Sequence, residues 1–227
     1  MPTLQVSAIK SSKPSIIKES DSDPYSGDGS EKELASTFRG GSGLSGSMFT
    51  LKAFNCISIT NIDVNVAIRD PIIEVWVRLG NYLGYERDRS SWTLHFVGVV
   101  KGIGPSKIPQ ELFDTIRLDE YSDLSVYVTV QGETGMIYTR GVEEGRVFSQ
   151  NEDLAILEGV GVRYPFGQSF SPRIWNGSVS YVQNSCQNSQ CPKNKIWKEW
   201  KQKCVPRCRK RHGQRFNWSL DKCVAVG

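Results

Sequence analysis

Residues 124–130 read Leu-Ser-Val-Tyr-Val-Thr-Val, with an apolar side chain at every second position. Successive side chains of a β-strand point to opposite faces, so this alternation predicts a strand with one face in a core. The same period of two recurs at residues 62–68, 73–78 and 92–100. Four such segments in one chain predict an antiparallel sheet.

The remaining segments favour an all-β fold. Weaker strand candidates are residues 49–54, 136–139, 154–159 and 178–182, and turn residues separate them at short intervals. Only Gln110–Leu118 has the composition of a short helix. Many short strands are typical of an antiparallel β-sandwich with jelly-roll-like connections, which is the predicted fold class.

Composition divides the chain into three parts. Residues 1–33 are rich in Ser, Lys, Asp, Glu and Gly and offer little apolar surface, so we predict that they are disordered. Residues 34–183 form the predicted β-sandwich domain, and a glycine-serine run at 40–47 is either a linker or its first loop. Residues 184–227 form a predicted Cys-rich, basic tail.

The N-terminal sequence leaves the compartment open. The first 20 residues contain lysines but lack the continuous apolar region of a secretory signal. No stretch approaches the roughly 18 apolar residues of a membrane span. The protein is therefore either intracellular, exported unconventionally, or preceded by a start upstream of Met1.

The five tail cysteines predict covalent or metal cross-links: Cys186, Cys191, Cys204, Cys208 and Cys223. In an oxidising compartment they form disulfides. Because five is an odd number, either Cys56 supplies the sixth thiol, or Cys56 is a small buried residue and one tail thiol stays free. In a reducing compartment Cys191, Cys204, Cys208 and His212 are a candidate tetrahedral Zn²⁺ site.

The tail also concentrates positive charge. Residues 192–223 carry eleven Lys or Arg against Glu199 and Asp221, while the whole chain has a net charge of only +4. Basic residues among tryptophans suit an anionic polysaccharide or a nucleic acid, although a solvated charged face is the simpler alternative. The predicted contacts are Lys198, Lys201, Lys203, Arg207, Arg209, Lys210 and Arg211.

Several distinct motifs follow one another along the domain. They lie at 43–49, 80–86, Trp92-Thr93-Leu94, 127–129, 138–141, Leu157–Gly161, Tyr164–Gly167 and Phe170–Gly177. In these motifs the chain resembles a family of largely uncharacterised β-domains from predicted secreted and cell-surface proteins of microalgae and some bacteria. The resemblance implies an extracellular jelly-roll-like module, often joined to Cys-rich segments, with no established catalysis. Arg140, where the family pattern has asparagine, and the missing export signal depart from that pattern.

The segment 164–177 is the predicted ligand-binding site. Its prolines and glycines predict an ordered loop and not a strand. As a recognition platform for sugar rings it presents Tyr164, Phe166, Arg173 and Trp175, whereas the alternative places these aromatic rings in the core. Two sequons, at Asn176 and Asn217, are candidate glycosylation sites of a secreted protein.

Catalytic signals are weak throughout the chain. No nucleophile elbow, P-loop or HExxH motif occurs, and His95, in mid-strand, is more typical of structure than of general-base catalysis. Loop carboxylates form a candidate Ca²⁺ site, although solvated loop charge is the simpler interpretation; they are Glu143, Glu144, Asp153 and Glu158.

Three functions follow from these features. The leading hypothesis is a non-catalytic extracellular surface or matrix module that contacts carbohydrate or anionic polysaccharide and needs no cofactor. An intracellular, Zn²⁺-stabilised nucleic-acid-binding protein is the second. A jelly-roll carbohydrate-active hydrolase that uses Glu158 is the third, and it rests on architecture alone.

Overall fold

The computed structural model describes residues 29–132 and 134–186, together with the backbone of four short tail strands. Predictions for residues 1–28 lie outside this range. The described chain is built from strands and two 3-10 turns, η1 (Arg89–Ser91) and η2 (Gln110–Leu112), and contains no α-helix. No helix in this range is long and apolar enough to cross a membrane.

Fifteen strands form the domain. They are β1 (Glu31–Ala35), β2 (Ser42–Leu44), β3 (Gly46–Ala53), β4 (Ile57–Val66), β5 (Ile72–Leu79), β6 (Thr93–Val99), β7 (Gly104–Lys107), β8 (Ile116–Leu118), β9 (Asp123–Val130), β10 (Met136–Arg140), β11 (Val147–Gln150), β12 (Leu154–Leu157), β13 (Gly159–Val162), β14 (Ser169–Trp175) and β15 (Gly177–Gln183). In the tail, β16 (Lys195–Lys198) pairs with β17 (Lys203–Pro206), and β18 (Gln214–Asn217) pairs with β19 (Lys222–Ala225).

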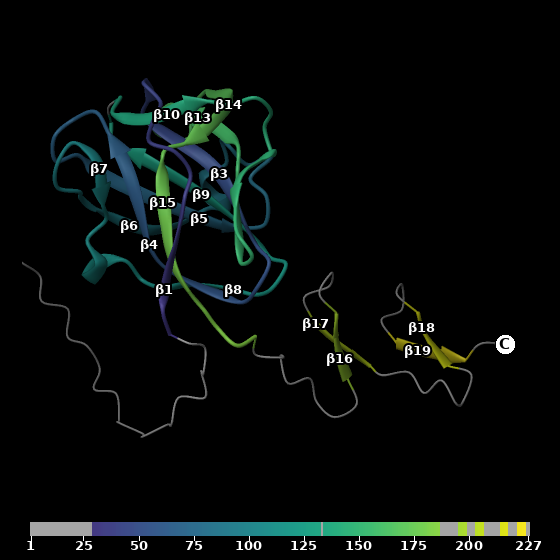
Figure 1. Ribbon diagram of the computed structural model, residues 1–227. Coiled ribbons are helices and arrows are strands. Elements are labelled where there is room, and N and C mark those ends of the chain that lie inside the picture. Colours follow the sequence, from purple (N-terminus) through teal and green to yellow (C-terminus); the bar gives the residue numbers. More distant parts are fainter. Residues whose placement is uncertain are drawn as a thin grey trace, which may run out of the picture.

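The domain is an antiparallel β-sandwich, as the alternation predicts. Its main sheet path runs β1-β15-β4-β10-β14-β13-β3-β9-β5-β6 and folds back on itself. Figure 1 shows β1, β15 and β4 in one layer and β3, β9 and β5 in the other, with β10, β13 and β14 at the end where the layers join. β7 and β8 extend the first layer beyond β4.

The four strongest predicted strands share one interior. Val75 on β5 pairs with Phe96 on β6 and with Val128 on β9. Val64 on β4 belongs to the same buried cluster from the opposite layer. The period of two thus identifies the inward-facing residues correctly on β4, β5 and β9.

A second apolar cluster covers the outer face of β3, β9 and β5. Trp76 and Tyr127 point to this side, where Tyr82 and Trp92 from residues 80–92 pack on them together with Phe166. The Phe166 ring meets Tyr127 at 4.8 Å and Trp76 at 5.3 Å between ring centroids, both edge to face. These strands are therefore buried on both faces.

Three sequence-based boundaries are corrected by the structure. β1 begins at Glu31, inside the segment predicted to be disordered, because its backbone pairs with Ser178–Val182 of β15. Segment 164–177 contains β14 and is not a continuous loop; a bulge opposite Gly159–Gly161 accommodates Pro172, which has no N–H for the ladder. Gln110–Leu118 forms only the turn η2 and then β8.

A disulfide joins Cys56, just before β4, to Cys186, just after β15, with 5.1 Å between the Cα atoms. This confirms the alternative in which Cys56 pairs with a tail cysteine. Cys191 and Cys208 lie outside the described residues, as do the side chains of Cys204 and Cys223 on β17 and β19.

Candidate functional site

The gap between the two layers of the sandwich is bridged on one side and open on the other. On one side Lys32 of β1 reaches across the layers, and its Nζ lies 2.7 Å from Oδ2 of Asp153. Asp153 is buried and also accepts hydrogen bonds from Asn55 Nδ2 at 2.8 Å and Tyr181 Oη at 3.2 Å. Burial works to raise the pKa of Asp153, but these donors outweigh it and hold the pKa below its usual value.

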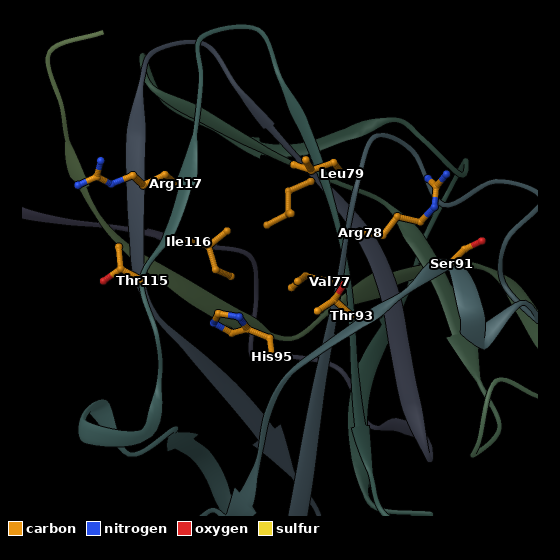
Figure 2. A pocket seen from close by; sticks show the side chains of 10 residues that line it. Val77, Arg78, Leu79, Ser91, Thr93, His95, Thr115, Ile116 and Arg117 are labelled. Carbon is orange, nitrogen blue, oxygen red and sulfur yellow. The ribbon is translucent and has the colours of Figure 1, made fainter. Parts of the chain in front are cut away.

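The opposite side remains open as a cleft of about 600 Å³ between β6 and β8. This volume falls within the range of small-ligand pockets. Figure 2 shows Val77, Ile116, Thr93 and His95 around its centre, with Arg78 and Arg117 extending away on opposite sides. The other lining residues are Leu79, Ser91, Thr115 and Leu124.

A β-bulge directs His95 into this cleft. On β6, Phe96 pairs with Val75 and Leu94 with Trp76, so His95 is an extra residue between them. The bulge also reverses the phase of the strand: Leu94, predicted to share a face with Phe96, is exposed instead. Bulges often re-aim a side chain in this way next to a functional site.

His95 connects the two layers. Its ring meets Phe113 edge to face, with 4.7 Å between centroids. Its Nε2 lies 2.7 Å from the carbonyl oxygen of Asp114 and must carry the hydrogen, because a carbonyl only accepts. In the neutral ring, Nδ1 therefore remains an acceptor.

The charged residues that line the cleft are all arginines. The Arg78 guanidinium stacks on Tyr85, 3.7 Å from the ring centroid, and donates to the carbonyl oxygen of Asn81. Arg117 lies on the far rim, on β8. With apolar side chains at the centre and no carboxylate in the lining, the cleft is suited to a ligand with an apolar surface and negative charge.

No model of a known protein family matches this chain, and neither does any curated protein. The chemistry of the cleft is therefore the main guide to its ligand.

The predicted recognition platform is not assembled on the surface. Trp175 is fully buried and stacks on Phe49 with 4.2 Å between centroids and 8° between planes. Phe166 is buried in the second apolar cluster. Burial therefore supports the core alternative for both rings.

The other two platform residues are partly exposed but serve separate contacts. Tyr164 Oη donates to Glu74 Oε1 at 3.2 Å. Arg173 lies over the Tyr138 ring, 5.4 Å from its centroid, and donates to the Pro172 carbonyl oxygen at 2.7 Å. None of the four platform residues lines the cleft.

The loop carboxylates are engaged within the fold. Glu158 is buried, and its Oε2 accepts hydrogen bonds from the backbone N–H groups of Val142 at 2.6 Å and Glu143 at 3.0 Å. Glu144 accepts from Tyr82 Oη at 2.6 Å. In the described residues no three His, Cys, Asp or Glu side chains lie close enough to hold a metal ion.

The remaining predicted sites fall in two groups. Asn176 is fully buried, and its Oδ1 accepts from Thr139 Oγ1 at 2.9 Å, so a glycan there is incompatible with the folded domain. The other predicted tail sites, which include Asn217 and His212, have side chains outside the described residues. Only the backbone is described for Lys198 in β16, Lys203 in β17 and Asn217 in β18.

Proposed function

We propose that this chain is a non-catalytic, extracellular binding module whose cleft between β6 and β8 binds an acidic polysaccharide. The observation that carries the proposal is the composition of the cleft: apolar side chains at its centre, arginines on opposite rims and no carboxylate among its lining residues.

Each part of the cleft matches a part of such a ligand. The C–H face of a sugar ring packs on Val77 and Ile116, while its hydroxyl groups find hydrogen-bond partners in Thr93 and in Nδ1 of His95. Carboxylate or sulfate groups on neighbouring sugar units are attracted by the positive charges of Arg78 and Arg117 on the two sides of the cleft.

The absence of catalysis is supported by the same lining. Most glycoside hydrolases place two carboxylates across the scissile bond, and the cleft contains none. Glu158, the candidate of the hydrolase hypothesis, does not line the cleft, and its carboxylate is hydrogen-bonded to the backbone of the turn after β10.

The extracellular location is supported by the disulfide between Cys56 and Cys186. Disulfides persist in oxidising compartments and are rare in the cytosol. In the proposed arrangement the basic tail supplies a second, less selective attraction for the same polyanion.

Calorimetric titration tests this assignment with uronate oligosaccharides, sulfated oligosaccharides and a neutral glucan of equal length. We expect Arg78→Gln combined with Arg117→Gln to weaken binding of an acidic oligosaccharide roughly tenfold, through the loss of two positive charges beside the cleft. Arg146→Gln, an exposed arginine away from the cleft, is the matched control and should bind like the unaltered protein.

Two results would contradict the proposal. Equal affinity for the neutral glucan would show that the arginines do not contribute to binding. Release of shortened oligosaccharide during long incubation would show that the module is an enzyme.

A further inference from the structure

Two arginines lie directly opposite each other where β10 pairs with β14, at one end of the domain (Figure 1). The register places Arg140 against Arg173. The Gly141 N–H donates to the Pro172 carbonyl oxygen at 3.2 Å, so the two arginines form the adjacent non-hydrogen-bonded pair, in which side chains lie closer together. Directly opposite residues project from the same face of a sheet, and like charges in this position destabilise the pairing.

Neither guanidinium group is neutralised by the described part of the chain. Every ion pair in that part is formed by a lysine. Two carboxylates belong to the same end of the domain, but both are engaged elsewhere. Glu158 accepts two backbone N–H groups, and Glu144 accepts two side-chain hydroxyl groups. The positive charges of Arg140 and Arg173 are therefore left without a paired carboxylate.

Arg173 is held in position but is not fully hydrogen-bonded. Its guanidinium lies over the Tyr138 ring, 5.4 Å from the centroid, and one terminal nitrogen donates to the Pro172 carbonyl oxygen at 2.7 Å. Its Nε–H is buried and has no acceptor among the described residues. An unpaired buried donor costs free energy, and more so when the group is charged. Because Arg140 is exposed, the pair can be reached from solvent.

We propose that Arg140 and Arg173 form a binding site for one tetrahedral oxyanion, a sulfate or phosphate group. Its negative charge offsets the repulsion between the arginines, and its oxygen atoms accept hydrogen bonds from both guanidinium groups. A carboxylate has only two oxygen atoms, which a single arginine fork can occupy, whereas a tetrahedral group presents oxygen atoms to two forks. Neither arginine lines the cleft, so this site is separate from the proposed polysaccharide site.

Thermal unfolding of the full-length protein in sodium sulfate tests the site, with sodium chloride at equal ionic strength as the reference. A ligand that binds only the folded state stabilises it, so the unfolding temperature should rise by about 3–6 °C at roughly ten times the Kd. Arg140→Gln and Arg173→Gln should each abolish this rise. Arg69→Gln, an exposed arginine between β4 and β5, is the matched control and should keep it. The general stabilising effect of sulfate acts on all variants alike.

The same variants measure the repulsion between the arginines. In a buffer of low ionic strength without sulfate, Arg140→Gln should unfold at the same temperature as the unaltered protein or at a higher one, because the like-charge pair is gone. This result would also show that Arg140→Gln folds, so its missing response to sulfate reflects the lost site. A clearly lower unfolding temperature would mean that Arg140 stabilises the domain without an anion and would contradict the proposal.

Proton–nitrogen NMR spectra supply a direct readout. The Arg173 Nε–H resonance should shift on addition of sulfate with the Kd found from unfolding, and it should not shift in Arg140→Gln. A sulfated monosaccharide distinguishes two sources of the anion: binding comparable to sulfate indicates a sulfate ester, whereas binding of inorganic sulfate or phosphate alone indicates a free ion. A thermal shift that Arg140→Gln retains, or an Arg173 resonance that does not move, would overturn the proposal.

Discussion

Replacing Trp175 distinguishes a core residue from a ligand platform. The side chain is fully buried and stacked on Phe49, so Trp175→Ala should create a cavity and lower the free energy of unfolding by about 3–5 kcal/mol. Loss of the ring stack adds about 1 kcal/mol. In the described structure Trp175 Nε1 has no hydrogen-bond partner, so its removal relieves an unsatisfied donor and returns about 1–3 kcal/mol. The expected net loss is about 3 kcal/mol.

Trp175→Phe is the informative companion variant. It keeps an aromatic ring next to Phe49 and removes the unpartnered N–H, so its cost should be smaller, about 1 kcal/mol. Urea unfolding followed by circular dichroism, with the disulfide intact, measures both values. Neither folded variant should lose affinity for an acidic oligosaccharide, because Trp175 does not line the cleft. Loss of binding at unchanged stability would refute the assignment of Trp175 to the core.

Four further predictions concern the rest of the fold. Glu158→Ala should lower unfolding free energy by roughly 2–4 kcal/mol, since two backbone N–H groups lose their carboxylate acceptor; urea unfolding measures the loss, and unchanged saccharide binding checks that Glu158 has no role in the cleft. Gly159→Ala should prevent folding, judged by circular dichroism, because a Cβ there would lie 2.0 Å from the Met48 carbonyl oxygen. Cys56→Ser should cost about 2–5 kcal/mol in the same unfolding assay by opening the link to Cys186. Because the folded pKa of Asp153 is depressed, its contribution to stability is present above about pH 4 and lost as pH falls through the folded pKa, so thermal unfolding of Asp153→Asn should depend less on acid than that of the unaltered protein.

The sequence predicts the fold correctly where burial of a strand face determines the pattern of apolar residues. Residues 62–66 and 124–130 alternate because one face of β4 and of β9 carries apolar side chains into the main core, and the structure places those faces as predicted. The opposite face of β9 is buried as well, under the second apolar cluster, which the alternation did not predict. β1 escaped prediction because Glu31–Ala35 contains a single large apolar residue, Leu34. Its position depends on backbone pairing with β15 and on the contact between Lys32 and Asp153, partners 121 residues apart that no local pattern reveals.

The cleft was harder to predict because a bulge creates part of it. Strict alternation places Leu94 and Phe96 on one face of β6 and His95 on the other. Because His95 is an extra residue on β6, it points into the cleft instead, and Leu94 is exposed while Phe96 stays in the core. Bulge positions depend on the register with a neighbouring strand, which local periodicity does not contain. Trp175 shows the converse case. Its motif suggested a ligand-binding site, but the side chain packs against Phe49 in the core.

The two sides of the sandwich differ in a way that determines where a ligand can enter. β1 carries charges along its edge, and its Lys32 closes the gap between the layers. β6 is neutral, and its open side leaves Val77 and Ile116 lining a cleft. In the proposed function, a sugar ring that contacts Val77 and Ile116 therefore enters between the layers from the β6 side, because Lys32 and Asp153 bridge the layers on the β1 side.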